Sequence, residues 1–199
     1  MRLIYQISAL VLAATPAMAK DAYFVGPVYS QLVSVLAPSD FTPGFEHEAD
    51  GFYILELTPA GETVENWTQL ITITGSKDAA KWMTPREFLT EVTKGILAEC
   101  PDTITGGALP PVEISGAASA VGIYLGCGSI NGQSEEVMEI AIQGRSDIYT
   151  VQWAAHGPAT DKLPEPDPAI WTPRFQALAA TLICDKVAGE KPPYAPCTQ

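Results

Sequence analysis

Basic residues are scarce in this sequence. The 199 residues include 11 lysines and arginines against 23 aspartates and glutamates, which gives a formal net charge of -12. Such a chain repels the phosphate backbone of nucleic acids and the head groups of anionic lipids, because it offers few cations to neutralise either. The composition therefore argues against nucleic acid as a partner and against electrostatic docking on a membrane.

Long apolar runs are missing as well. Hydrophobic residues make up 47% of the chain and charged residues 17%, a balance that excludes disorder. The longest apolar run is shorter than the ~20 residues that a membrane-spanning helix needs. A length of 199 residues fits one or at most two domains, at the usual ~100 to 200 residues per domain, and a single core is sufficient at this size.

The N-terminus has the pattern of an export signal. Arg2 precedes the mostly apolar stretch Leu3–Ala14, and Ala17-Met18-Ala19 then supplies the small-x-small site that a signal peptidase cleaves. An uncleaved anchor helix is the alternative, but this stretch is short for a bilayer and no stop-transfer pattern follows it. We therefore expect a cleaved signal peptide, a periplasmic or secreted location, and no stable membrane insertion after cleavage.

Cysteine is limited to Cys100, Cys127, Cys184 and Cys197, all beyond the predicted cleavage site. An even number of cysteines in an exported chain indicates disulfides, although their spacing alone does not choose among the three pairings. We favour Cys100 with Cys127 and Cys184 with Cys197, because each pair joins a predicted helix end to the next ordered or tail segment. No CxxC or CxH spacing is present, so we expect no zinc site.

Enzyme motifs are also lacking. The sequence has no G-x-S-x-G elbow, no phosphate-binding loop with its lysine, and no HExxH pair. His47 and His156 are the only histidines, and each is alone in its segment, so we expect neither to be catalytic. The acidic segment 46–50 lacks the ligand spacing and central glycine of a calcium loop, and we interpret it as a solvated connection. We expect no catalytic residue, no cofactor and no metal.

Apolar periodicity predicts an α+β fold, with a mostly antiparallel sheet flanked by two main helices. In the first helix, Thr84, Pro85 and Glu87 form a capping box with proline at the first position. The apolar residues of this helix share one face: Phe88, Leu89, Val92, Ile96 and Leu97. The second helix is expected to open at Thr172-Pro173 and to carry one apolar face: Phe175, Leu178, Ala179, Leu182 and Ile183.

Alternation and β-branched residues predict the strands. They are expected at 29–37, 51–58, 67–74, 117–127, 137–143 and 148–153. Pro43-Gly44 marks 39–50 as a loop, and a second loop is expected after Pro101. If Gln143 faces Ile148 in the last hairpin, one face carries a buried row of opposed pairs: Ile142 and Tyr149, Ile140 and Val151, Met138 and Trp153.

The combination of GETVENWTQLITIT at Gly61–Thr74, TPREFL at the helix start, GRSDIYTVQW at Gly144–Trp153, and the closing CDK and PC resembles an uncharacterised family of exported proteobacterial proteins. The order of elements is more loosely similar to PsbP-like domains, in which helices flank a mostly antiparallel sheet. That resemblance implies a sandwich that acts as an accessory or assembly module, and it implies no catalytic residues. Fold likeness does not fix function.

Three functional hypotheses follow. The first is a binding or accessory module for a protein partner in the cell envelope, which should expose an apolar patch or a sheet face. The second is a hydrolase or metal-dependent enzyme whose site is built from dispersed residues. The third is a carrier of a small ligand, which needs a cavity between sheet and helix. The oligomeric state does not follow from the sequence.

We predict that the mature protein begins at Lys20 and forms a single globular domain over 20–199, because Ala19 completes the cleavage site. The intact mass of protein recovered from the periplasm measures this directly. Recovery of protein that still carries residues 1–19 would contradict the prediction.

Overall fold

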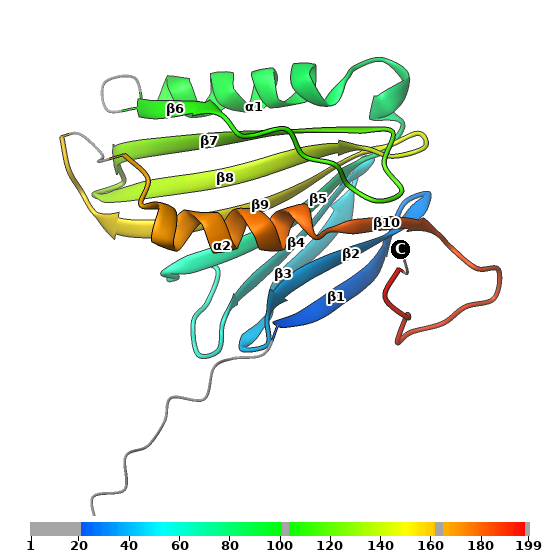
Figure 1. Ribbon diagram of the computed structural model, residues 1–199. Helices are drawn as coiled ribbons and strands as arrows, with labels where there is room; N and C mark the ends of the chain where they lie inside the picture. The colour runs from blue at the N-terminus through cyan, green and yellow to red at the C-terminus, as the bar shows by residue number, and fades with distance from the viewer. Residues whose placement is uncertain (1–20, 101–103, 162–164, 198–199) are drawn as a thin grey trace, which may run out of the picture.

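The computed structural model describes residues 21–100, 104–161 and 165–197. The expected signal peptide and its cleavage site, Ala19 and Lys20, lie outside the described residues. Figure 1 shows a large sheet with α1 along one side and α2 beside a smaller sheet. Among the described residues, neither helix is long and apolar enough to cross a membrane.

The described chain forms ten strands, two helices and one 3-10 turn. The strands are β1 (Asp21–Val28), β2 (Gln31–Pro38), β3 (Phe41–Ala49), β4 (Phe52–Pro59), β5 (Gln69–Ser76), β6 (Ile104–Ala108), β7 (Ser119–Ile130), β8 (Gln133–Gln143), β9 (Ile148–Pro158) and β10 (Leu182–Asp185). The helical elements are η1 (Ala79–Lys81), α1 (Pro85–Glu99) and α2 (Pro168–Ala179).

The strands make two antiparallel sheets. The larger has seven strands in the order β3-β4-β5-β9-β8-β7-β6, and the smaller has the order β1-β2-β10. All of the neighbouring named strands are antiparallel. This confirms the α+β fold class, with a mostly antiparallel arrangement and two main helices.

The predicted hairpin register is correct. Gln143 faces Ile148 in the β8–β9 pairing, and Ile140 faces Val151. Both Ile140 and Val151 are fully buried, because the small sheet and α2 cover this face of the large sheet. We call this the inner face.

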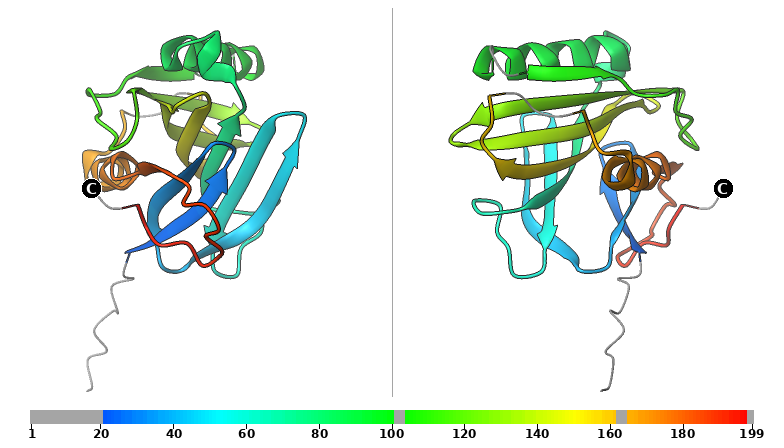
Figure 2. Two further views of the ribbon diagram at one scale, coloured as in Figure 1. Left: turned by 90° about the vertical axis from the view of Figure 1, so that its right-hand side faces the viewer. Right: turned by 60° about the vertical axis from the view of Figure 1, so that its left-hand side comes forward.

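The main core lies on the inner face. It joins residues of β2, β5, β8 and α2, among them Val35, Ile71, Ile140 and Trp171. The edge of the Tyr124 ring on β7 packs against Trp171 of α2, with ring centroids 5.7 Å apart. Because successive strand residues point to opposite faces, Ile123 must face the other way, toward α1. The two helices therefore lie on opposite faces of the large sheet (Figure 2).

The prediction of a loop at 39–50 is wrong, because most of this segment forms the edge strand β3. It pairs with β4 over its length, with a register shift between Pro43 and Phe45. An edge strand bonds on one side only, so it tolerates a proline and a bulge that a central strand does not. Most of β3 is exposed, which explains why its polar residues read as a loop.

The second helix, α2, begins and ends earlier in the chain than the sequence predicts. It begins at Pro168 behind the N-cap Asp167, contains Pro173, and ends at Ala179. Leu182 and Ile183, expected on its apolar face, instead form β10 and pair with β2. Their burial is correct, but they are buried by a sheet rather than by a helix.

Two strand ends were also missed. β7 and β8 run beyond the strands expected at 117–127 and 137–143, and the turn between them is confined to Asn131 and Gly132, which both have positive φ, at 51° and 83°. Asn-Gly is the usual pair for a two-residue hairpin turn, and it extends β7 and β8 by several residues. In addition, Ile104–Ala108, expected as loop, forms the edge strand β6 on β7.

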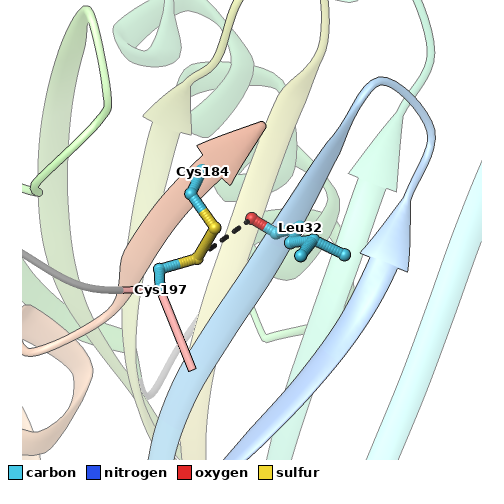
Figure 3. The surroundings of a disulfide bond; sticks show 3 residues. All are labelled: Leu32, Cys184 and Cys197. Carbon is cyan, nitrogen blue, oxygen red and sulfur yellow. Dashed lines mark hydrogen bonds between the residues drawn. A yellow bond between two sulfur atoms is a disulfide. The ribbon is translucent and has the colours of Figure 1, made fainter. Parts of the chain in front are cut away.

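Both favoured disulfides are present. Cys100 bonds to Cys127, which joins the end of α1 to β7, and Cys184 bonds to Cys197, which holds the tail on β10. Figure 3 shows the second bond beside β2, where Cys197 Sγ lies 3.9 Å from the Leu32 carbonyl oxygen.

A buried carboxylate joins the two sheets. Asp147, 1% exposed, lies in the turn between β8 and β9. Its Oδ2 accepts bonds from the Ser30 amide (3.1 Å) and hydroxyl (2.6 Å), and its Oδ1 accepts one from the Asp78 amide (2.8 Å). Burial acts to raise the pKa of Asp147, but bonds from Ser30, Asp78 and Ser146 outweigh it and hold the pKa below its usual value.

The same carboxylate holds two strained turns. Tyr29 and Asp78 have positive φ angles of 51° and 60°, a region that side chains other than glycine rarely occupy. Tyr29 precedes the donor Ser30, and Asp78 is itself a donor. The charge-assisted bonds to Asp147 offset the cost of these conformations.

We predict that Asp147→Asn lowers the free energy of unfolding by about 2 to 4 kcal/mol. The amide NH₂ of asparagine cannot accept a hydrogen bond, so the donors that now bond to one carboxylate oxygen would be buried without an acceptor. Urea denaturation measures this. The control is Asp185→Asn, which removes an exposed ion pair with Arg145 and should cost at most about 1 kcal/mol. Equal effects of the two substitutions would contradict the prediction.

Candidate functional site: a cleft between α1 and the sheet edge

The N-terminus of α1 is capped as the sequence predicts. The Thr84 hydroxyl accepts a bond from the Glu87 amide at 3.3 Å, and the Glu87 carboxylate accepts one from the Thr84 amide at 2.7 Å. The bonds from Thr84 lower the pKa of Glu87. The capping box therefore fixes where the helix begins.

Both ends of α1 are attached to the large sheet. Before the helix, the Ala80 amide in η1 bonds to the Ser146 carbonyl in the β8–β9 turn at 3.1 Å. After the helix, Cys100 is bonded to Cys127 on β7. Between these points α1 packs over β7 and β8.

A cleft of about 460 Å³ opens between α1 and the edge of the sheet. One helical row, spaced by four residues, faces it with Leu89, Thr93 and Leu97. A second row lies beside it with Arg86, Thr90 and Lys94. The opposite sides are formed by β6, β7 and the segment between them: Ala108, Leu109, Pro110, Pro111, Val112, Ala120, Val121, Gly122 and Ile123.

The cleft lies where the short strand β6 ends. Ala108 is the last residue of β6 and faces Ile123 on β7. The N-terminal part of β7, residues 119–122, therefore has no strand paired with it on this side. Gly106 lies against Leu125 and the Tyr124 carbonyl, where an added Cβ would be only 2.7 Å from that oxygen. A larger residue at Gly106 is therefore excluded by close packing.

Leu97 is on the predicted apolar face of α1, but the cleft leaves part of its side chain exposed. Of the five residues of the expected apolar face, Leu89 is buried at 3% exposure, and Phe88, Val92 and Ile96 are half-buried. Leu97 remains 42% exposed, although it is a cleft residue. Its apolar surface is available to a bound molecule.

The chemistry of the lining favours binding. Its side chains are aliphatic, proline, threonine, arginine and lysine, with no carboxylate, imidazole or thiol. Such a lining buries apolar surface and offers positive charge at one side, but it contains no group that takes up a proton near neutral pH or acts as an activated nucleophile. Ligand sites commonly have this volume and this largely apolar character.

The two histidines lie elsewhere. His156 stacks on Trp67 with ring centroids 3.5 Å apart, and its Nε2 lies 3.2 Å from a Glu135 carboxylate oxygen. Its Nδ1 lies 3.2 Å from the Trp67 carbonyl oxygen. This imidazole–carboxylate pair is not predictable from local sequence, because Glu135 and His156 meet only through the β8–β9 register. Both ring nitrogens are engaged by acceptors.

His47 lies on β3, and its ring stacks with Phe45 at 6.2 Å. Glu46 and Glu48 flank it in the strand, so they point to the opposite face. Tyr53 donates a hydrogen bond to Glu46 at 2.9 Å. The solvated loop expected at 46–50 is therefore a strand that divides its polar groups between two faces, and the described residues contain no group of three or more metal-ligating side chains.

A third ionisable cluster lies on the inner face near α2. The Arg174 guanidinium lies 4.5 Å from the Trp171 ring centroid and 5.5 Å from that of Trp153, and it donates to Gln69 at 2.8 Å. Tyr124 donates to Glu136 at 2.5 Å. Burial lowers the pKa of Arg174, and the nearby Glu136 opposes this. These contacts attach α2 to the sheet.

Glu139 is a buried carboxyl beside the cleft floor. It pairs across the sheet with the cleft residue Ile123, and it is 3% exposed beneath α1. Within the described residues, its Oε2 has no hydrogen-bond partner. Burial raises the pKa of Glu139 to about 7, and the hydrogen bond from Thr150 offsets only part of this.

The sequence pointed to part of this site. The apolar face of α1 was predicted, and Leu97 was on it. Arg86 and Lys94 were not singled out, although their spacing with Thr90 places the three on one line of the helix. The cleft itself depends on where β6 ends, and β6 was expected as loop.

No protein-family model matches the chain, and no curated protein matches it. Among solved structures, it is similar to the crystal structure of LpqN, which is involved in cell envelope biogenesis of Mycobacterium tuberculosis, with 12% sequence identity and a TM-score of 0.40. The match covers 83% of this chain and 91% of that chain. A TM-score of 0.40 does not establish a common fold, and the likeness to PsbP-like domains is not shown, so function rests on the residues themselves.

We predict that Glu139→Gln reduces the loss of stability on going from acid to neutral pH. The folded pKa of about 7 lies above the usual 4.5, so the folded state holds the proton more tightly. The contribution of this group is therefore complete below pH 4.5 and is lost as the pH rises through about 7. At pH 8 the variant should be more stable than the wild type by about 1 to 3 kcal/mol, and at pH 4 it should not be.

Urea denaturation at both pH values checks this, with the exposed Glu113→Gln as the control for the loss of one negative charge. The same pH dependence in wild type and Glu139→Gln would show that the buried carboxyl is not responsible.

Proposed function

We propose that this protein is an exported, non-catalytic binding module of the cell envelope, and that the cleft between α1 and β7 holds its ligand. Of the three hypotheses drawn from the sequence, the carrier required a cavity between sheet and helix. The cleft of about 460 Å³ is the observation that carries the proposal.

The attachment of α1 supports a preformed site. The capping box, the η1 contact and the Cys100–Cys127 disulfide hold the helix at a fixed distance from β7. A cleft that exists before binding avoids the entropic cost of ordering its walls. The disulfides also support an extracytoplasmic location, because such bonds persist in oxidising compartments.

The enzyme hypothesis finds less support. The titratable groups that meet in pairs, His156 with Glu135 and Tyr124 with Glu136, lie at other places on the sheet than the cleft lining. Among the described residues, His156 contacts the carbonyl and ring of Trp67, and Tyr124 packs against the Trp171 ring. These contacts orient the two groups without supplying a nucleophile. Binding is therefore the function that the geometry supports best.

A protein partner in the envelope is the second candidate, and one observation favours it. Phe45 on β3 and Phe52 on β4 are each 43% exposed. The β3–β4 register places both on the outer face of the large sheet, away from the main core. Exposed aromatic side chains on a sheet face are typical of protein contacts. This candidate is favoured if the protein captures one defined envelope protein, if that capture requires both phenylalanines, and if it does not require Leu97.

We predict that Leu97→Gln weakens the binding of a neutral apolar probe, Nile red, about threefold to tenfold, because the cleft loses part of an apolar side chain worth about 1 kcal/mol. Fluorescence titration of the mature protein measures this. The melting temperature should be nearly unchanged, since Leu97 is 42% exposed.

Ile170→Gln is the matched control, because Ile170 is a 49% exposed residue of α2 outside the cleft. It should leave probe binding unchanged. Absence of saturable binding to the wild type, or an equal loss in both variants, would overturn the proposed function.

A further inference from the structure

The cleft concentrates positive charge in a chain that has little of it. Arg86 and Lys94 both line it, whereas the whole sequence has a net charge of -12. Lys94 is already paired with Glu91 at 2.6 Å. Arg86 is exposed, and within the described part of the chain its guanidinium has no ion pair. Arg86 is therefore the cation available to a ligand.

The apolar and charged residues are arranged side by side along the helix. Leu89, Thr93 and Leu97 form one row toward β7, and Arg86 begins the next row. Arg86 and Leu97 are eleven residues apart, which is about 16 Å along the axis of an α-helix. A ligand that uses both therefore needs an extended apolar part and an anionic group at one end.

We infer that the cleft binds a monomeric single-chain amphiphile with a carboxylate head group, whose chain lies between α1 and β7 and whose carboxylate pairs with Arg86. This inference rests on the proposed function. The guanidinium presents two parallel N–H donors, which match the two oxygens of a carboxylate. The aliphatic lining accepts the chain by the hydrophobic effect.

Size and charge favour a dispersed ligand over a lipid in a bilayer. A volume of about 460 Å³ lies in the lower part of the usual range for ligand pockets, about 300 to 1,000 Å³, which suits one chain better than two. The net charge of -12 repels an anionic bilayer, which presents many charges at once. A single carboxylate at Arg86 is less affected, because other charges more than about 8 Å away are screened at physiological salt.

The test is isothermal titration calorimetry of the mature protein with three twelve-carbon ligands: dodecanoate, dodecanol and dodecyltrimethylammonium. The two ionic ligands are kept below their micelle concentrations and dodecanol below its solubility limit. Dodecanoate should bind most tightly. Arg86→Gln should weaken dodecanoate binding about fivefold to tenfold and leave dodecanol binding unchanged, and Arg86→Lys should keep part of the preference. Lys191→Gln, which removes one positive charge outside the cleft, should leave the affinities for all three ligands unchanged.

The outcomes separate the two proposals. Equal affinity for dodecanoate and dodecanol, or an equal effect of Arg86→Gln on both, overturns the carboxylate assignment while the binding function stands. Binding of none of the three ligands overturns the proposed function itself. Cosedimentation with phosphatidylglycerol vesicles in the absence of dodecanoate binding overturns the assignment to a free amphiphile and points to a bilayer lipid.

Discussion

The carboxylate of Asp147 is the contact on which the arrangement of this protein depends. It is buried, and it accepts hydrogen bonds from the β1–β2 turn through Ser30 and from the turn after β5 through Asp78. The small sheet, the large sheet and the approach to α1 therefore meet at one negative charge. Their turns carry positive φ angles at Tyr29 and Asp78, conformations that persist because the carboxylate bonds hold them. A neutral side chain in this position would leave several donors buried without an acceptor.

The position of α1, and with it the cleft, follows from this contact. Asp78 begins the turn η1, which leads directly to the capping box at Thr84. The far end of the helix is bonded to β7 through Cys100 and Cys127. In the chain-entropy model, closing this loop raises the free energy of the unfolded chain by ~3.5 kcal/mol, which stabilises the folded state by the same amount. A helix held at both ends cannot settle further onto the sheet, so the space beside the short strand β6 stays open.

Local signals made some of these features predictable, and tertiary pairing decided the others. The capping box, the apolar face of α1 and the β8–β9 register follow from residues that are close in sequence or from simple alternation. The disulfide pairs follow from joining each expected helix end to the next ordered or tail segment. The edge strands β3 and β6 were missed because glycine, proline and polar residues read as loop, whereas an edge strand needs only one partner. Leu182 and Ile183 have apolar spacing that suits a helix, but pairing with β2 takes them into a sheet. Arg86 became a candidate only once the fold placed it in the lining of one cleft with Val121 and Leu97.

The central claim is that the cleft between α1 and β7 is where this protein binds its ligand. Two-dimensional ¹H–¹⁵N NMR of the mature protein during titration with dodecanoate tests it most directly, because it reports the place of binding residue by residue. The account predicts saturable shifts concentrated in 86–97, 108–112 and 120–123, the segments that line the cleft. Shifts confined to the exposed phenylalanines of β3 and β4, or no shifts at saturating ligand, would contradict it.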